Sequence, residues 1–302
     1  MTLEHSSTPY RAFAPTPTSS KLWLLKQIGG SHHRLCRQYA FVSTNDNGKE
    51  KGLIVFVAAS TECWPEMELE EAIEALSDLE FTAVEIAIHE SGKVKPSEIL
   101  ADLDRGVQLL RHTHRLDIAG YSVELASKGD QHYADFKNIC RVAKATKVVN
   151  ITVPSAEQGT PFNEEVEHLR KLVEVAETEG VRVSVRSQLG CMSEDPDTLM
   201  VLCNNCDGLG ITLDPSVYIT GSANQANTDN ILKFVCNVHL RDTRPDAFQV
   251  SVGQGEVDYG KIVTQLERDK YDRALTVHMV PTEGLDHRVE LRKLRRLLET
   301  LM

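Results

Sequence analysis

The sequence predicts an α/β protein, a single (β/α)8 TIM barrel preceded by an irregular N-terminal extension. Three observations lead to this prediction. From residue 53 onward, short β-branched runs alternate with helical patterns. Eight such units are present, and strand–helix alternation produces parallel strands with right-handed crossovers, which eight units close into a barrel. The length of 302 residues suits one barrel of about 250 residues plus an extension.

The predicted strands share short apolar or β-branched runs bounded by turn residues. They cover residues 53–59, 83–88, 116–121, 148–153, 181–185, 210–213, 235–240 and 274–279. Helical patterns fill the intervals, for example at 68–79, 98–112, 164–179 and 288–301. No glycine-rich dinucleotide fingerprint follows the first strand, which argues against an open, doubly wound sheet.

The chain divides into two regions by composition. Residues 1–50 begin with a stretch rich in proline, serine and threonine and end with a polar run at 43–48. Such a segment buries too little apolar surface to offset the entropy of ordering it, so we expect a partly disordered extension. Residues 51–302 are expected to form the barrel.

Composition restricts the partners and the compartment. The net charge of −11 disfavours nucleic-acid binding, because an acidic surface repels phosphate backbones. No run approaches the roughly 18 apolar residues of a membrane span. Seven cysteines, an odd number, without a recognisable secretion signal indicate a reducing compartment. We therefore expect a cytoplasmic protein that acts on a small molecule, with no nucleic-acid or membrane partner.

Polar residues at the strand ends predict the position of a site. Alternate residues of a barrel strand face the interior, and the last inward residues lie at the C-terminal mouth, where barrel enzymes perform chemistry. Four successive strand ends carry Arg186, Asp214, His239 and His278, and burying these ionisable groups together is costly unless they pair or bind a ligand. A ligand site is expected, although an Arg186–Asp214 ion pair that plugs the barrel is an alternative. The inward positions are Glu85, Asn150, Thr152, Ser184, Arg186, Thr212, Asp214, His239, Thr276 and His278.

Several of these residues lie in segments that carry a family resemblance. The segments are 181–190 (VRVSVRSQLG), 213–216 (LDPS), 238–242 (VHLRD) with 253–258 (GQGEVD), and 275–281 (LTVHMVP). Over about residues 53–302 the chain resembles the xylose-isomerase-like sugar isomerase/epimerase family. The resemblance implies a (β/α)8 barrel that interconverts aldoses, ketoses and related polyol carbonyl compounds in carbohydrate metabolism, and often a homodimer.

The resemblance also implies a metal site, which is altered here. Family members hold a divalent metal with a Glu, an Asp, a His and a Glu at the ends of strands five to eight, and the two glutamates move the proton. Asp214 and His239 match this pattern, whereas Arg186 and His278 stand where the glutamates belong. Asp214, His239 and His278 remain a workable ligand set for one divalent ion such as Mn, Zn or Mg, provided that Arg186 swings away.

The predicted function is a sugar or polyol isomerase or epimerase that transfers a proton between adjacent carbons at this altered metal site. Arg186 would hold the carbonyl oxygen as an electrophile. His278 or His239 would shuttle the proton, with Glu85 as a further base. A turn at 253–255 offers backbone N–H groups to an anion. The predicted substrate-binding residues are Asn150, Gln188, Arg241 and Arg244.

Two other functions remain open. A binding or regulatory barrel without chemistry would retain a cleft for a sugar, sugar acid or phosphate, and the missing family glutamates favour it. The endonuclease branch of the same superfamily cuts DNA at abasic sites and needs several metals. The strand ends here offer too few His and Glu ligands for that, and the charge is unsuitable.

Overall fold

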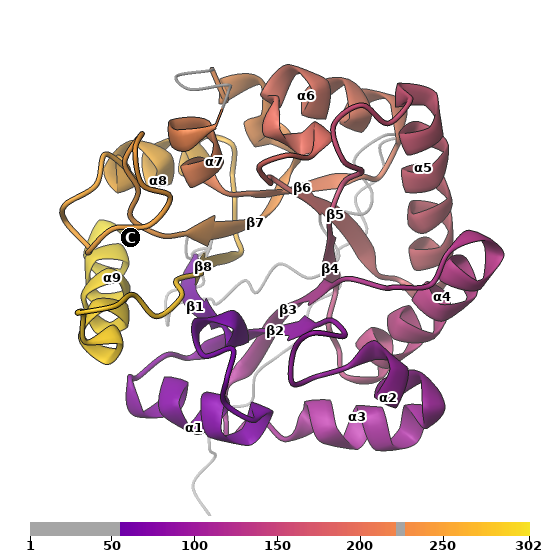
Figure 1. The fold of residues 1–302 in the computed structure, drawn as a ribbon, viewed down its shortest axis with the longest axis horizontal. Helices are drawn as coiled ribbons and strands as arrows, with labels where there is room; N and C mark the ends of the chain where they lie inside the picture. Colours follow the sequence, from indigo (N-terminus) through magenta and orange to yellow (C-terminus); the bar gives the residue numbers. More distant parts are fainter. Residues whose placement is uncertain (1–54, 222–226) are drawn as a thin grey trace, which may run out of the picture. The chain divides into compact units, whose positions relative to one another are not determined.

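The computed structural model describes residues 55–221 and 227–302. These residues form a closed barrel of eight parallel strands with helices around it (Figure 1). The predicted barrel is confirmed, while the expectation for residues 1–50 falls outside the described part of the chain. Among the described residues, no helix has the length and apolar character needed to cross a bilayer.

Each strand pairs in parallel with the next one along the chain, and β8 returns to pair with β1. Two predicted carboxyl ends differ from the structure by two residues. β3 extends two residues further than predicted, to Val123, and β8 ends at Val277, so that His278 begins the following loop. The strands are β1 (Phe56–Ser60), β2 (Ala83–Ile88), β3 (Asp117–Val123), β4 (Asn150–Val153), β5 (Arg182–Arg186), β6 (Gly210–Leu213), β7 (Val235–Leu240) and β8 (Ala274–Val277).

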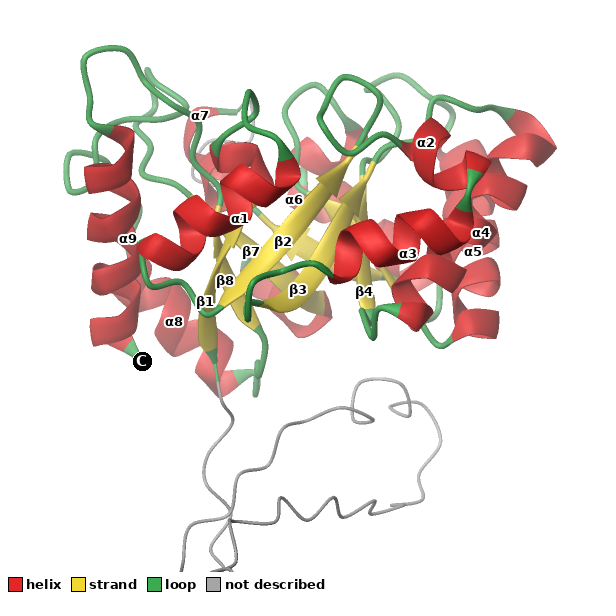
Figure 2. Ribbon diagram, turned by 90° about the horizontal axis from the view of Figure 1, so that it is seen from below, coloured by secondary structure: helices red, strands yellow, loops and turns green. Residues whose placement is uncertain are grey.

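Helices surround the strands, and all strand arrows point to the same end of the barrel (Figure 2). The helix predicted at 98–112 is interrupted. Asp102 adopts an extended conformation there, and its side chain accepts a hydrogen bond from the Arg105 N–H and so caps a second helix. The helices are α1 (Leu69–Asp78), α2 (Pro96–Ala101), α3 (Leu103–Arg111), α4 (Gly129–Ala145), α5 (Phe162–Glu179), α6 (Pro196–Asn205), α7 (Pro215–Thr220), α8 (Tyr259–Arg268) and α9 (His287–Leu301), with 3₁₀ turns η1 (Thr61–Cys63), η2 (Met192–Glu194) and η3 (Asp229–Phe234).

Strand β5 shows how alternation separates the core from the barrel interior. Val183 and Val185 are buried in the main hydrophobic core. Ser184 lies between them on the other face, where its hydroxyl contacts Asn150 and Thr212 from neighbouring strands. The predicted phase of this strand is therefore confirmed. The same alternation directs polar side chains of the other strands into the interior, and these side chains build the site.

Candidate active site

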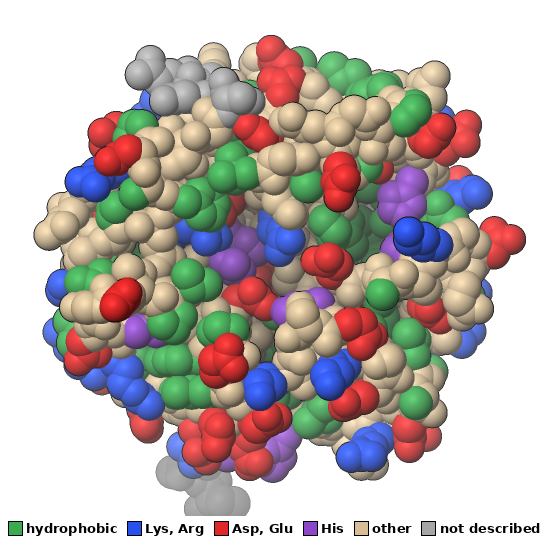
Figure 3. Space-filling model, in the orientation of Figure 1, with side chains coloured by type: hydrophobic (Ala, Val, Ile, Leu, Met, Phe, Trp, Pro, Cys, Tyr) green, Lys and Arg blue, Asp and Glu red, His purple; other side chains and the backbone are tan. Residues whose placement is uncertain are grey.

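The carboxyl ends of the strands form a hollowed face. Figure 3 views this face, because it shares the orientation of Figure 1 and the strand arrows of Figure 2 point toward it. The space-filling view shows basic and histidine side chains at the bottom of the central hollow (Figure 3). Barrel enzymes place their chemistry at this end. The polar residues of the hollow are therefore the candidates for function.

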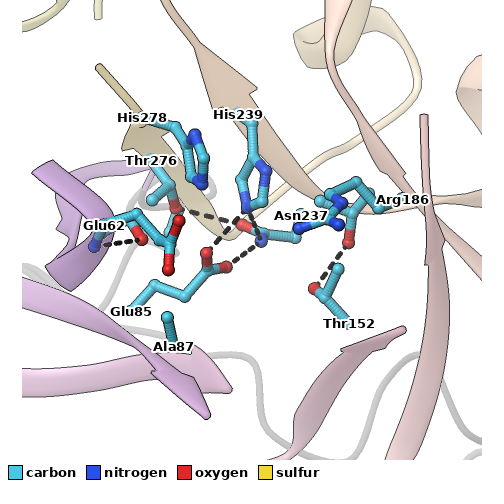
Figure 4. Close-up of polar contacts among 12 residues, drawn as sticks. Glu62, Glu85, Ala87, Thr152, Arg186, Asn237, His239, Thr276 and His278 are labelled. Atoms are coloured by element: carbon cyan, nitrogen blue, oxygen red, sulfur yellow. Dashed lines mark hydrogen bonds and ion pairs between the residues drawn. The ribbon is translucent and has the colours of Figure 1, made fainter. Parts of the chain in front are cut away.

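The Glu85 carboxylate and the His239 ring lie in contact, fully buried, at the base of the site (Figure 4). The Glu85 Oε1 and His239 Nε2 atoms are 2.8 Å apart. The other carboxylate oxygen of Glu85 accepts a hydrogen bond of 2.5 Å from the Asn237 side-chain amide. The Thr276 hydroxyl donates to Asn237 Oδ1 at 3.1 Å and so fixes which way the amide faces. Strands β2, β7 and β8 together orient this glutamate.

Arg241 supplies a cation to the same end of the barrel. Its Nη2 atom lies 2.8 Å from Asp214 Oδ2 and 2.8 Å from His278 Nδ1. The second oxygen of Asp214 accepts a hydrogen bond from the backbone N–H of Ser216. Arg241 is only 7% exposed, and its guanidinium carbon lies 4.6 Å from the centre of the Phe248 ring. The guanidinium is therefore held on several sides, and Asp214 already has a positive partner.

His278 is neutral in this setting. Burial lowers the pKa of His278 well below the ordinary value of a histidine, and nearby His239, Arg241 and Arg186 lower it further. The rings of His278 and His239 stack at 4.5 Å with an angle of 15° between their planes. Because Arg241 can only donate, His278 Nδ1 must accept, and the ring proton resides on Nε2.

Four buried polar atoms of this cluster have no hydrogen-bond partner among the described residues. They are Glu85 Oε1, His278 Nε2, His239 Nδ1 and Arg241 Nε. Buried polar atoms are normally hydrogen-bonded, and each exception needs an explanation such as water or a ligand. The three nitrogen atoms belong to residues in or after strands β7 and β8. The bottom of the hollow therefore offers both donors and an acceptor to oxygen atoms of a bound molecule.

The opposite wall of the interior is polar but uncharged. The Ser184 and Thr212 hydroxyls are 2.7 Å apart, and the Thr152 hydroxyl lies 2.8 Å from that of Thr212. Asn150 donates its side-chain N–H to Ser184 at 3.0 Å. The barrel interior thus has an ionic half on β2, β7 and β8 and a hydroxyl-lined half on β4, β5 and β6. The hydroxyls of Thr152, Ser184 and Thr212 are fully buried and bond to one another, so they fill this half of the interior.

The remaining predicted site residues lie nearer the rim. Arg186 is half-buried, and its Nη2 and Nε donate to Gln188 Oε1 at 2.8 and 3.3 Å. Asp214 pairs with Arg241, so the pairing observed here differs from the Arg186–Asp214 plug considered above. Arg244 is exposed and lies 3.2 Å from Asp246. The structure thus brings Glu85, Asp214, His239, Arg241 and His278 into one cluster and places Arg244 outside it.

The turn at 253–255, which was expected to bind an anion, binds the carboxylate of Asp242 instead. The backbone N–H groups of Gly253 and Gly255 donate to Asp242 Oδ2 at 2.7 and 3.0 Å. A Cβ atom on Gly255 would lie 2.0 Å from Asp242 Oδ1, which explains the need for glycine there. Asp242 directly follows Arg241, so this turn fixes the chain beyond β7 and helps to position the arginine.

Sequence reasoning missed one pair at the mouth, Glu62 and His89. Glu62 Oε1 and His89 Nε2 are 2.6 Å apart, and His89 Nδ1 lies 2.8 Å from the Ser91 hydroxyl. Figure 4 shows Glu62 on the same side of the site as Thr276 and His278. Glu62 belongs to the 3₁₀ turn η1, where strand alternation gives no information on direction. Its position directly after the first strand was the available signal.

The cluster allows a direct test of whether its residues fit a divalent metal. One ligand atom each of Glu85, His239 and His278 lies within 4.8 Å of the others, which is compatible with a metal site. The hydrogen bonds of the cluster, however, are not compatible with a metal site. Asp214 and His278 Nδ1 both bind Arg241, and His278 Nε2 carries the ring proton. His239 Nε2 faces the Glu85 carboxylate. In this arrangement the residues at the family's metal position do not fit a divalent ion.

The comparisons with known proteins agree with the fold. The family model described as xylose isomerase-like TIM barrel matches residues 73–299. No curated protein sequence matches this one. The similar solved structures include a D-tagatose 3-epimerase-like protein, with 16% identity and a TM-score of 0.63 over 82% of this chain and 98% of that one.

Two further solved structures are similar. The 3-keto-D-glucoside 4-epimerase from E. coli has 14% identity and a TM-score of 0.63, over 82% of this chain and 99% of that one. A xylose isomerase-like protein from Mycobacterium smegmatis in complex with magnesium has 14% identity and a TM-score of 0.64, over 82% of this chain and 96% of that one. At such identities the likeness establishes the shared fold.

Proposed function

Because this chain belongs to the xylose isomerase-like TIM barrel family, we propose that it is an isomerase or epimerase of a small sugar or polyol carbonyl compound. One observation carries the proposal. Five ionisable side chains, from β2 and from the ends of β6, β7 and β8, gather in one cluster. All five are buried, and four of their polar atoms have no hydrogen-bond partner among the described residues. A cluster this costly to bury is typical of a functional site.

The proposed reaction needs only a group that takes up and returns a proton and a cation that stabilises the negative charge formed on the carbonyl oxygen. A base removes the proton from the carbon next to the carbonyl, and the bonding electron pair moves onto the carbonyl oxygen. While the base holds the proton, it can exchange with solvent. Return of a proton to the former carbonyl carbon, with the neighbouring hydroxyl proton moving to the former carbonyl oxygen, gives an isomer. Return of a proton to the original carbon from the opposite face gives an epimer. Atoms and electrons balance without a redox partner. The protein must therefore provide a proton carrier and a fixed positive charge.

The residues present can take these roles. His278, at 7% exposure, is the histidine of the cluster nearest to the mouth, and its Nε2–H can donate to a substrate oxygen. Glu85 and His239 lie directly behind it as a proton-carrying pair. Arg186 and Gln188 lie at the rim and suit hydroxyl groups of the substrate, whereas the predicted Asn150 is buried deeper in the barrel against Ser184. The substrate class is a small polyhydroxylated aldehyde or ketone.

Exchange of carbon-bound hydrogen with solvent tests the proposal. Free and phosphorylated ketoses and aldoses are incubated in D2O with the full-length protein and followed by proton NMR. We expect loss of the signal of the proton next to the carbonyl for at least one compound. His278→Gln and Glu85→Gln should abolish the loss, whereas Glu290→Gln, at a buried glutamate of α9, should retain it.

A binding barrel without chemistry is the second candidate. Its support is that Arg186 and His278 replace both proton-moving glutamates of the family pattern and that the cluster is internally hydrogen-bonded. Saturable binding of a sugar or polyol with no deuterium uptake across the panel would favour this candidate and reject the isomerase. Deuterium uptake that depends on His278 would reject the binding-only barrel.

A further inference from the structure

The clearest departure from the family pattern lies where the resemblance places a metal ion. We infer that the guanidinium of Arg241 takes the place of the divalent cation in this site. The inference rests on the proposed function only for the role of this charge in the reaction. The cation content of the site can be measured without any substrate, so the two proposals can fail separately.

A single nitrogen of Arg241 contacts both key positions. Asp214 ends strand six and His278 follows strand eight, and each places its accepting atom 2.8 Å from Arg241 Nη2. In the family these two positions hold a metal ligand each. A guanidinium is planar, always charged and rich in donors, so it can satisfy two acceptors at once. Arg241 is also fixed by the Phe248 ring and by the anchored Asp242 that follows it.

The charges of the site support the same conclusion. Glu85 and Asp214 contribute two negative charges, and Arg186 and Arg241 contribute two positive charges, which leaves no net charge while the histidines are neutral. A divalent ion would leave a net charge of +2 in a site whose members are mostly buried. Buried charges that lack a counter-ion are strongly unfavourable. The arginine already provides the neutralisation that a metal supplies to a carboxylate-rich site.

This position gives the arginine a role beyond pairing with Asp214. Its Nε–H is buried and lacks a partner among the described residues. A substrate oxygen that accepts from this group would receive the positive charge needed when the carbonyl becomes an enediolate. The proposed reaction should therefore be insensitive to chelators.

Manganese binding tests the inference directly. Free Mn2+ is followed by electron paramagnetic resonance after the full-length protein has been dialysed against a chelator. We expect the wild type to bind no Mn2+ in a way that depends on Asp214. Arg241→Ala combined with His278→Glu frees Asp214 and restores the family's carboxylate, so it should bind about one equivalent and melt at a higher temperature with Mn2+. Arg295→Ala, at another buried, ion-paired arginine, is the matched control and should gain nothing.

Two results would overturn the inference. One is stoichiometric Mn2+ binding by the wild type that disappears in Asp214→Asn. The other is a folded Arg241→Ala/His278→Glu protein that gains no affinity for Mn2+. Should that variant fail to fold, the Arg241→Met protein, which preserves most of the side-chain volume, is titrated instead. The comparison of the wild type with Asp214→Asn tests the inference whether or not that double variant folds.

A second inference stands on a different part of the molecule. We propose that Glu70, His112 and His114 form a surface site for a divalent transition-metal ion of the zinc class. The Nε2 atoms of His112 and His114 lie 3.8 and 3.5 Å from Glu70 Oε1. Ligand atoms of Glu70, His112 and His114 all lie within 4.8 Å of one another. Two imidazoles, one carboxylate and a water molecule can complete a tetrahedral zinc site.

Two elements far apart in the sequence build this surface cluster. Glu70 lies on α1, and the histidines belong to the connection between α3 and β3. His114 and Arg115 both have a positive φ, of 43° and 82°, which is an uncommon conformation for two consecutive residues with side chains. This strained turn holds the two imidazole rings 5.0 Å apart. Small movements of these exposed side chains would bring all three ligand atoms to zinc distances.

Zinc titration against a chromophoric chelator tests the surface site. We expect the wild type to bind about one Zn2+, and Glu70→Gln or His114→Ala to weaken binding by about tenfold or more, which corresponds to 1.4 kcal/mol or more. His132→Ala, at a histidine on α4, serves as the control and should bind like the wild type. Equal zinc affinity in the wild type and in a His112→Ala/His114→Ala protein would overturn the proposal.

Discussion

Two clusters of one glutamate and two histidines occur in the described part of this molecule, with opposite surroundings. Glu85, His239 and His278 are buried in the barrel mouth, whereas the exposed cluster of Glu70, His112 and His114 lies on the outer surface. In the buried cluster the Glu85–His239 distance is 2.8 Å. In the exposed cluster the shortest glutamate–histidine distance is 3.5 Å, too long for a strong hydrogen bond.

The difference shows that ligand types alone do not make a metal site. In the buried cluster, Arg241 binds His278 Nδ1 and Asp214 and provides the positive charge. The three residues of the exposed cluster are open to solvent, so a metal ion would only need to displace water there. The residues that the resemblance associates with metal binding are thus less suited to it than a surface group with no counterpart in the family pattern.

The largest expected difference between the clusters is in stability. Glu85→Ala removes a fully buried carboxylate and leaves His239 and Asn237 without their partner, so it should lower the free energy of unfolding by about 3–5 kcal/mol. Glu70→Ala removes an exposed carboxylate and should change it by less than about 0.5 kcal/mol. Urea unfolding of both variants measures the contrast. Similar losses for the two would contradict this account of the buried cluster.

A third histidine environment, that of the partly buried His168 on α5, should make the stability of the protein depend on pH. Burial, followed by the nearby His132 and Lys171, lowers the pKa of His168 to about 4. Between about pH 6.5 and 4 the unfolded chain binds a proton at this position and the folded protein does not, so stability decreases as the pH falls. The decrease per pH unit should stay below about 1.4 kcal/mol, because water partly reaches the ring. Thermal melts of His168→Gln should show a shallower decrease than the wild type.

The smallest expected difference in stability comes from losing one hydrogen bond, either in the buried cluster or on the protein surface. Thr276→Val leaves Asn237 Oδ1 unpaired beside Glu85 and should cost about 1–3 kcal/mol. Thr300→Val removes an exposed hydroxyl that bonds to the Leu297 carbonyl and should cost less than about 0.5 kcal/mol. Differential scanning calorimetry of the pair measures both. A Thr276→Val protein as stable as the wild type would show that the Asn237 amide has another partner.

Strand alternation made much of this arrangement predictable from sequence. Apolar neighbours such as Val183 and Val185 fixed the phase of each strand, and parallel strands end at one mouth, so the gathering of Glu85, His239 and His278 followed. These inferences depend on local pattern and barrel geometry, both of which are legible in one sequence. The fold itself is as expected for the described residues.

Specific pairings were less predictable because they depend on loops and on side-chain reach. Arg241 was expected to bind substrate, and only the structure shows its guanidinium between Asp214 and His278. Glu62 lies in a 3₁₀ turn without strand periodicity. The exposed cluster joins α1 to the turn before β3, a contact between segments far apart in sequence. Competition among several possible partners decides such pairings, and sequence spacing does not rank them.

Closure of the barrel has a consequence for how the site is made during synthesis. Val57 and Ala58 of β1 pair with Leu275 and Thr276 of β8, nearly the whole barrel sequence later. A ribosome delivers β1 first, so one edge of that strand stays unpaired until the last strand emerges, and unpaired edges promote aggregation. The same final segment carries Thr276 and His278. A chain that terminates before β8 therefore lacks part of its site. It also leaves the free edges of β1 and β7 unpaired. Every incomplete copy should then be inactive and a substrate for chaperones and proteases.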